Sequence, residues 1–214
     1  MSRLFVVIPA AGHSRRMGCP KLLLPWGEHT VVEQVLRCFD HPAVAARVVV
    51  VRPTDTALAS TVRRAGGIAL QPEADPPEMR DSVQLALDWM DREFHPAPND
   101  GWILSPADHP LLVPDLFRRL VVRWNQGDCG ILVPEFEGKR GHPVFFRWDL
   151  ADEVARLPAD QGLNALVRGH ADDVVVLPVT DPGILVDLDT PADYDRLRTG
   201  HPPPTALNPE REQV

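Results

Sequence analysis

The 214-residue sequence lacks several features that would assign it to a specialised class of protein. Its three cysteines, Cys19, Cys38 and Cys129, lie far apart without CxxC spacing. Such a set favours reduced thiols over a disulfide framework. No apolar run approaches the roughly 20 residues of a membrane-spanning helix, and no basic segment followed by a long apolar core begins the sequence. We therefore expect a cytoplasmic protein.

Positive charge is also scarce. The sequence has 22 lysines and arginines against 30 aspartates and glutamates, a formal net charge of −8. This balance argues against nucleic acid or an anionic membrane as a partner. A local basic pocket is still compatible with it, and residues 15–21 would supply one.

The ordinary part of the composition indicates a globular domain. Hydrophobic residues make up 44% of the sequence and charged residues 24%, which is typical of soluble proteins. We expect one domain over residues 1–198. Residues 199–214 are polar and rich in proline, so they are predicted to form a disordered tail.

Strand-like and helix-like segments alternate along the chain. The predicted strands are residues 3–10, 46–53, 68–72, 100–104, 129–136, 142–146, 172–179 and 183–189. The predicted helices are residues 30–40, 55–67, 79–94, 113–127, 150–157, 162–169 and a short one from about Pro191. This alternation predicts an α/β fold, a single three-layer αβα domain around a mostly parallel, Rossmann-like sheet. One strand after residue 130 is expected to run antiparallel.

Ligands of such sheets bind at the carboxyl ends of the strands. The loops after Ile8, Leu104 and Val186 are therefore expected to share one rim. The first loop lies within IPAAGHSRRMGCPKLLLPWG, residues 8–27. Its small residues Ala10, Ala11 and Gly12 would let backbone N–H groups approach a phosphate.

Arg15 and Lys21 would add positive charge to this loop. The loop has neither the GxxxxGK[ST] nor the GxGxxG pattern. Residue types alone leave two interpretations open, a phosphate site or a solvated basic loop that caps a helix.

Carboxylates mark the other two loops. Asp108 follows a buried strand, where it could hold Mg²⁺ together with phosphate oxygens. It could instead cap the next helix, although Asp115 suits that task better. Asp187 and Asp189 alternate and would face one side of a strand. Asp189 could also be the N-cap of the last helix.

The first loop resembles the LAAGxSxRMGxxKxLLPW signature of the MobA-like nucleotidyltransferases, and more narrowly that of their molybdenum cofactor cytidylyltransferase branch. SPADHPLL, KRGHPVFF and VDLDTPADY follow in the expected order, so the resemblance spans roughly residues 4–195. Pro9 departs from the usual leucine. The resemblance implies a sheet of the nucleotide-diphospho-sugar transferase type and a first loop that wraps the triphosphate of a nucleotide.

The resemblance also assigns roles to residues. Arg15 is placed at the arginine position of the signature, where it and Lys21 would neutralise the leaving pyrophosphate, and Arg16 is interpreted as a surface charge. Asp108 and Asp189 would hold Mg²⁺, with Asp187 ranked behind Asp189. These assignments make Arg15, Lys21 and Asp108 the expected catalytic residues.

The remaining roles concern the base and the acceptor. Ser82 would contact the nucleobase, with Arg80 or Asp81 at the pocket border, unless Ser82 or Asp81 only caps the helix. The AAG triplet resembles enzymes that use CTP, whereas related guanylyltransferases tend to have AGG. Gly141, His142 and Pro143 resemble the acceptor-side loop, in which His142 would be a positioning residue. Leu163 and Asn164 depart from the family pattern, which leaves the acceptor open.

The resemblance therefore predicts a Mg²⁺-dependent transfer of CMP from CTP to the phosphate of molybdopterin cofactor, with release of pyrophosphate. Two alternatives are a sugar or polyol phosphate as acceptor, and a catalytically silent nucleotide-binding chaperone of a molybdoenzyme. The product could pass to a molybdenum hydroxylase apo-enzyme.

Overall fold

The structure, a computed structural model, describes residues 2–158 and 161–200. The last described element is a short 3₁₀ helix at Arg198–Gly200. Most of the predicted tail, residues 201–214, lies outside the described residues, and the domain boundary at residue 198 stays a prediction.

Eight strands form one sheet within this part of the chain, in the order β10-β7-β9-β6-β1-β4-β5, with β8 paired to β7. The strands are β1 (Leu4–Pro9), β4 (Val44–Val50), β5 (Ile68–Leu70), β6 (Gly101–Leu104), β7 (Ile131–Phe136), β8 (Lys139–Arg140), β9 (Val144–Arg147) and β10 (Val174–Pro178). β9 runs antiparallel to both β6 and β7, which confirms the expected antiparallel strand. Elsewhere on the main path the neighbouring strands are parallel.

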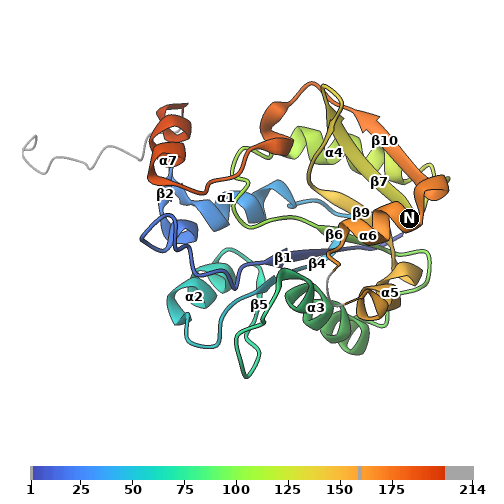
Figure 1. Ribbon diagram of the computed structural model, residues 1–214, viewed down its shortest axis with the longest axis horizontal. Coiled ribbons are helices and arrows are strands. Elements are labelled where there is room, and N and C mark those ends of the chain that lie inside the picture. The colour runs from blue at the N-terminus through green and yellow to red at the C-terminus, as the bar shows by residue number, and fades with distance from the viewer. Residues whose placement is uncertain (1, 159–160, 201–214) are drawn as a thin grey trace, which may run out of the picture.

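Helices cover both faces of the sheet, as the predicted three-layer architecture requires (Figure 1). The helices are α1 (Val31–Cys38), α2 (Thr56–Arg64), α3 (Met79–Phe94), α4 (Pro114–Trp124), α5 (Ala151–Arg156), α6 (Asn164–Gly169) and α7 (Pro191–Leu197). Buried residues of α1, α2 and α4 share one core cluster. Those of α3, α5 and α6 belong to the other.

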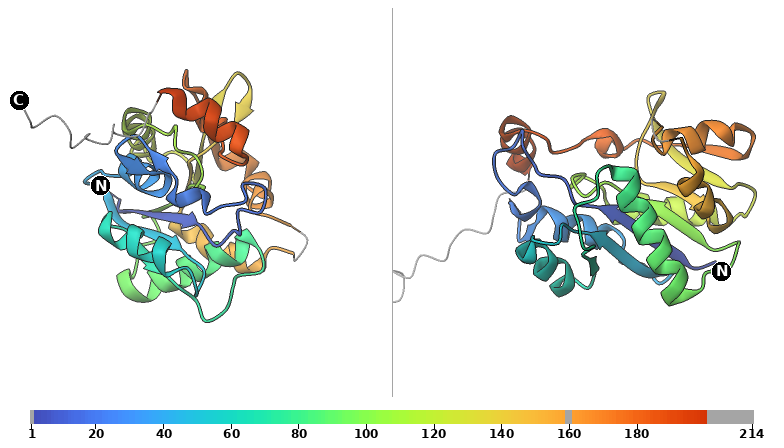
Figure 2. Two further views of the ribbon diagram at one scale, coloured as in Figure 1. Left: turned by 90° about the vertical axis from the view of Figure 1, so that its left-hand side faces the viewer. Right: turned by 60° about the horizontal axis from the view of Figure 1, so that its bottom comes forward.

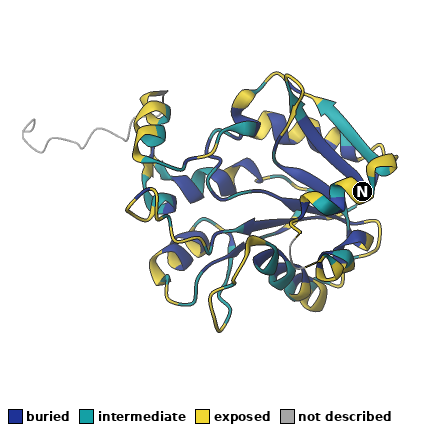
Figure 3. Cartoon of the chain, viewed as in Figure 1, coloured by how far each residue is buried: buried dark blue, intermediate teal, exposed yellow. Residues whose placement is uncertain are grey.

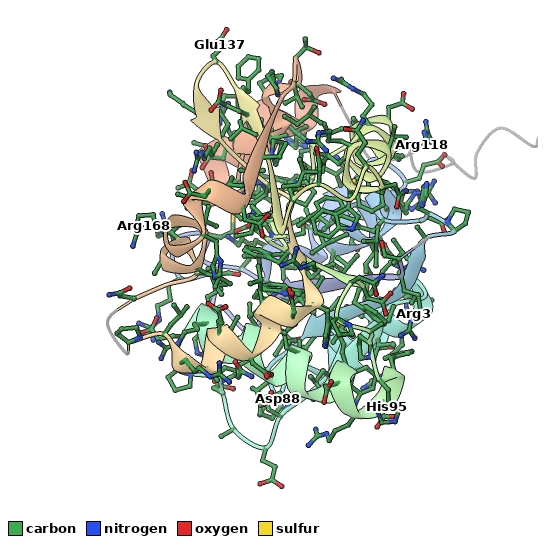
Figure 4. The ribbon with its side chains drawn as sticks, turned by 90° about the vertical axis from the view of Figure 1, so that its right-hand side faces the viewer. Arg3, Asp88, His95, Arg118, Glu137 and Arg168 are labelled. Atoms are coloured by element: carbon green, nitrogen blue, oxygen red, sulfur yellow. The ribbon has the colours of Figure 1, made fainter. Side chains whose placement is uncertain are left out.

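The sequence of β1 explains why the sheet is central. Leu4, Val6 and Ile8 pack into the first core cluster, and Phe5 and Val7 pack into the second. A strand whose neighbouring side chains all face apolar layers has no polar alternation. Figure 3 shows the result, with buried residues along the strands and exposed residues on the outer faces of the helices. Figure 4 shows labelled polar residues such as Asp88, Arg118 and Arg168 pointing outward.

One predicted strand is wrong. Residues 183–189 do not form a strand: Pro182–Leu185 is a 3₁₀ helix, and residues 186–189 are irregular. The amide of Leu188 donates to the carbonyl of Asp108 over 2.9 Å, which fastens this segment to the loop after β6. The segment therefore still reaches the expected rim, but by a contact with a loop rather than by strand pairing.

The last helix, α7, lies beside the first loop although the two are far apart in the sequence. The hydroxyl of Tyr194 in α7 donates to the carbonyl of Pro25 over 2.7 Å. Pro25 belongs to β2 (Pro25–Trp26), which pairs with β3 (His29–Thr30). Figure 2, in its left-hand view, looks onto this end of the molecule, where the first loop lies between α7 above and α2 below. Across the described residues, no helix has both the length and the apolar character needed to cross a membrane.

Candidate active site

A cavity of about 670 Å³ opens at the carboxyl ends of β1 and β6. One wall is the loop after β1, one is the segment before α3, and the third carries Asp108 and Asp189. The lining comprises Pro9, Ala10, Ala11, Gly12, His13, Ser14, Arg15, Arg16, Lys21, Leu22, Asp75, Pro76, Pro77, Glu78, Met79, Ser82, Pro106, Ala107, Asp108 and Asp189. The predicted phosphate, base and metal residues thus share one cavity.

The loop after β1 offers a series of free amides. Within the described part of the chain, no backbone N–H of residues 11–16 donates a hydrogen bond. The amide of Ala10 differs, because it donates to the carbonyl of Val50 over 2.9 Å. Ala10 therefore lines the cavity but cannot offer its N–H to a ligand. The free amides and the arginines beside them suit an anion such as phosphate.

Lys21 connects the two carboxylates of the opposite wall. Its Nζ donates to Asp108 Oδ2 over 2.7 Å and to Asp189 Oδ1 over 3.0 Å. The three side chains are 14%, 22% and 21% exposed, so the contacts are partly shielded from water. Burial alone lowers the pKa of Lys21. The hydrogen bonds and charges of Asp108 and Asp189 outweigh that effect, so its pKa lies above the ordinary value.

The interpretation of Arg16 as a surface charge is incomplete, because the side chain also contacts the site. It is exposed, as a surface charge should be, but its Nη1 lies 2.7 Å from Asp189 Oδ2 within the site. Counting along the signature SxRMG also places its arginine directly before Met17, which is Arg16 and not Arg15. Arg15 lines the cavity and makes no hydrogen bond or ion pair with any described residue. Both arginines are thus placed to contact a bound anion.

Asp189, and not Asp187, lies next to Asp108 across the Lys21 ammonium. Asp187 is exposed. Thr190 is the N-cap of α7, because its hydroxyl accepts from the amide of Asp193 over 3.2 Å. Asp189 is therefore free of the capping role that the sequence left open.

Asp108 does not cap a helix either. Val113 is the N-cap residue of α4, and its apolar side chain makes no capping hydrogen bond. The expectation that Asp115 serves as the cap is wrong, because this residue lies inside the first turn and pairs with Arg118.

Ser82 faces the cavity from the first turn of α3. The residue is only 2% exposed, yet its hydroxyl makes no hydrogen bond within the described residues. It is therefore available to a ligand. The capping alternative falls to Asp81, whose Oδ2 accepts from the amide of Glu78 over 2.9 Å. Arg80 does not border the cavity as expected, since it donates to the carbonyls of Leu157 and Pro158.

The GHP loop lies behind the Asp108 loop. Gly141 and His142 are fixed by backbone bonds, from Gly141 N to Pro134 O over 2.9 Å and from His142 N to Ile184 O over 3.0 Å. The His142–Pro143 peptide is cis. The ring of His142 meets that of His109 edge-on, with centroids 5.5 Å apart. These residues do not line the described cavity, so their acceptor-side role stays a prediction.

Comparison with known proteins gives the family. Residues 6–174 match the MobA-like NTP transferase domain. The chain belongs to the MobA-like NTP transferase family. Membership identifies it as a nucleotidyltransferase and confirms both the resemblance and the predicted fold class.

Two curated relatives match almost the whole length of this family member. The molybdenum cofactor cytidylyltransferase of Escherichia coli (strain K12) is 25% identical over 197 residues, which cover 91% of this chain and 95% of the relative. Purine catabolism protein PucB of Bacillus subtilis (strain 168) is 29% identical over 209 residues, with 91% and 96% covered.

The structure of Rv0371c from Mycobacterium tuberculosis H37Rv is similar to this fold, with a TM-score of 0.75 and 27% identity over 92% of this chain and 98% of that one. A manganese complex of Rv0371c gives a TM-score of 0.71 and 25% identity, with 92% and 99% covered.

The donor set of this MobA-like protein fits a magnesium ion. The described residues contain no group of three or more histidine, cysteine, aspartate or glutamate side chains placed to hold a metal. Two carboxylates, Asp108 and Asp189, do converge on one cationic atom, the Nζ of Lys21. Mg²⁺ commonly uses one or two carboxylates and completes its shell with water and phosphate oxygens. These two residues could therefore hold it.

The sequence analysis missed one further residue that lines the cavity, His13. His13 Nδ1 lies 3.1 Å from Arg52 Nη1, and its Nε2 lies 3.4 Å from Asp75 Oδ2. Arg52 can only donate, so Nδ1 accepts in this contact. His13 thus links two walls of the cavity. It occupies a variable position of the signature, which gave no signal for this role.

The buried His142 predicts a pH-dependent stability. Burial and the neighbouring His109 lower the pKa of His142 from 6.5 to about 4. The unfolded chain therefore binds more protons between these values, so stability is complete above pH 6.5 and falls as the pH drops toward 4. We expect His142 to account for a loss of about 1–2 kcal/mol in unfolding free energy between pH 7 and pH 5.

Denaturant unfolding of the wild type and His142→Asn at both pH values measures this effect. The variant should lose less stability than the wild type. His95→Asn, at an exposed histidine, is the matched control and should follow the wild type. Equal losses for all three proteins would contradict a depressed pKa of His142.

Proposed function

We propose that this protein transfers CMP from CTP to the terminal phosphate of molybdopterin cofactor. An oxygen of the acceptor phosphate attacks the α-phosphorus of CTP and forms a new P–O bond. The bond between the α-phosphorus and the oxygen that bridges it to the β-phosphorus breaks, and pyrophosphate is released. The observation that carries the proposal is the cavity that joins the free amides of residues 11–16 to the Lys21–Asp108–Asp189 cluster.

Different residues of the chain would bind the triphosphate and the metal ion. The free amides of the loop, with Arg15, Arg16 and Lys21, would bind and orient the triphosphate. Such positioning and charge neutralisation supply most of the catalysis in phosphoryl transfer. Asp108 and Asp189 would hold Mg²⁺, whose charge would stabilise the departing pyrophosphate. The acceptor phosphate is already anionic, so the chain needs no strong general base.

Two kinds of observation support the choice of substrates. CTP is supported by Ala11 in the AAG triplet and by the relative named molybdenum cofactor cytidylyltransferase. The same relative supports molybdopterin cofactor as the acceptor. The manganese complex of Rv0371c supports a divalent ion. A product carrying cytosine would then serve a molybdenum hydroxylase.

Pyrophosphate release with Mg²⁺ tests the proposal, using each of the four nucleoside triphosphates with molybdopterin cofactor or with a panel of sugar and polyol phosphates. We expect release with CTP and molybdopterin cofactor. Release only with a sugar or polyol phosphate would retain the chemistry and overturn the acceptor. CTP binding without release on any acceptor would favour a silent nucleotide-binding chaperone.

Ser82 gives a test of base recognition. We expect Ser82→Ala to raise the KM for CTP about three- to tenfold with little change in kcat, because one neutral hydrogen bond is worth about 0.5–1.5 kcal/mol. Steady-state kinetics measures this, with Ser60→Ala on the exposed face of α2 as control. A wild-type KM in Ser82→Ala would remove Ser82 from the base site.

A further inference from the structure

The ammonium of Lys21 occupies the space between the two proposed metal ligands. It donates to one oxygen of each, over 2.7 Å to Asp108 and 3.0 Å to Asp189. Arg16 takes the other oxygen of Asp189 at 2.7 Å. Both oxygens of Asp189 are therefore engaged by cations of the chain itself.

The charges of this cluster already balance. Two carboxylates face one ammonium and one guanidinium, so the formal sum is zero. A divalent ion that joined without displacing a partner would lie beside the Lys21 ammonium and be repelled by it. It would also find fewer free carboxylate oxygens, and hydrogen bonds to charged groups are among the stronger ones to break.

We propose that Lys21 competes with the divalent cation for Asp108 and Asp189, so that the ion binds tightly only together with the nucleotide. This inference rests on the proposed function, since it takes these carboxylates as the metal ligands. The triphosphate gives Lys21 and Arg16 new anionic partners on the same cavity wall. Their departure frees the carboxylates for the ion.

The local structure allows this exchange without refolding. The backbone of Lys21 is held at the start of a 3₁₀ helix, Lys21–Leu23, where its carbonyl accepts from the amide of Leu24 over 3.2 Å. Its four-carbon side chain can change rotamer about this fixed point. Asp108 is likewise anchored through its carbonyl to the amide of Leu188. Only the side-chain contacts have to be exchanged.

Binding of Mn²⁺ measured by electron paramagnetic resonance tests the competition in the nucleotide-free protein. We expect Lys21→Met to bind Mn²⁺ at least about tenfold more tightly than the wild type, because the competing ammonium is gone. Lys139→Met is the matched control, at an exposed lysine of β8, and should bind like the wild type. CTP should tighten Mn²⁺ binding to the wild type and reduce the difference between the proteins.

Lysine reactivity gives a second readout in the wild type, and it needs no variant to fold. The sequence has two lysines, Lys21 and Lys139. Acetylation followed by mass spectrometry should show Lys21 protected without metal and exposed as Mg²⁺ alone is raised. Lys139 should react at one rate throughout.

Equal Mn²⁺ affinities of wild type and Lys21→Met, or a Lys21 acetylation rate that Mg²⁺ leaves unchanged, would overturn the competition. Both readouts are independent of turnover. Competition without pyrophosphate release would defeat the proposed function alone, and normal pyrophosphate release without competition would defeat only this inference.

Discussion

Asp108→Asn should lower the rate of CTP-dependent pyrophosphate release by about 10²–10³-fold or more, while leaving the fold intact. Asparagine keeps the shape of the side chain and can still accept from Lys21, but it loses the negative charge that would hold the ion. Charge stabilisation in a preorganised site is commonly worth this much. Steady-state pyrophosphate release measures the loss, and thermal unfolding confirms that the variant is folded.

The control for this variant is Asp172→Asn, an exposed aspartate of the short helix before β10. It should retain the wild-type rate. Its charge change equals that of Asp108→Asn, so a loss in both proteins would reflect net charge rather than the site. An Asp108→Asn protein with a near-wild-type rate would show that Asp108 is not the essential metal ligand.

Gly141→Ala should cost about 2–3 kcal/mol of unfolding free energy, as overpacking of a rigid site does. A Cβ at this position would overlap the carbonyl oxygen of Ile184 and would lie 2.8 Å from its Cγ1. The backbone cannot withdraw easily, because Gly141 is bonded to Pro134 and His142 to Ile184. Denaturant unfolding at pH 7 measures the effect.

Gly169→Ala provides the comparison, since a Cβ there meets no atom of the described residues within 4 Å. We expect it to change the unfolding free energy by less than about 0.5 kcal/mol. If Gly141→Ala were as stable as the wild type, the GHP loop would not pack as closely against Ile184 as the structure shows. The loop would then not be held rigidly enough to position an acceptor.

Much of the fold could be predicted because local patterns determine it. The apolar run of β1 and the helical periodicity of α3 both led to the right elements and to one covered sheet. The strand predicted over residues 183–189 was wrong because an apolar run is equally compatible with an irregular backbone that packs on a loop. Pro182 and Gly183 begin a 3₁₀ helix there, and the hydrogen bond from Leu188 to Asp108 depends on tertiary contact.

In the site, too, the residues could be predicted from local sequence, whereas their contacts depend on the tertiary structure. The signature named Lys21 and Asp108, but no local rule brings Lys21 within 3.0 Å of Asp189, which is 168 residues away. The free amides of residues 11–16 likewise depend on tertiary structure, because they have no hydrogen-bond acceptor among residues 2–158 and 161–200. The role of Arg16 could have been predicted from the sequence, because the signature places its arginine directly before Met17.

The most direct test of the nucleotidyltransferase assignment is the product of the reaction, identified by mass spectrometry after incubation with CTP, Mg²⁺ and molybdopterin cofactor. We expect the cofactor to gain one CMP through a new diphosphate linkage, with one pyrophosphate released for each molecule formed. Pyrophosphate and a nucleotide-linked acceptor should both be absent with Asp108→Asn. Bound CTP that wild-type protein leaves intact with every phosphate acceptor would contradict nucleotidyl transfer by this site.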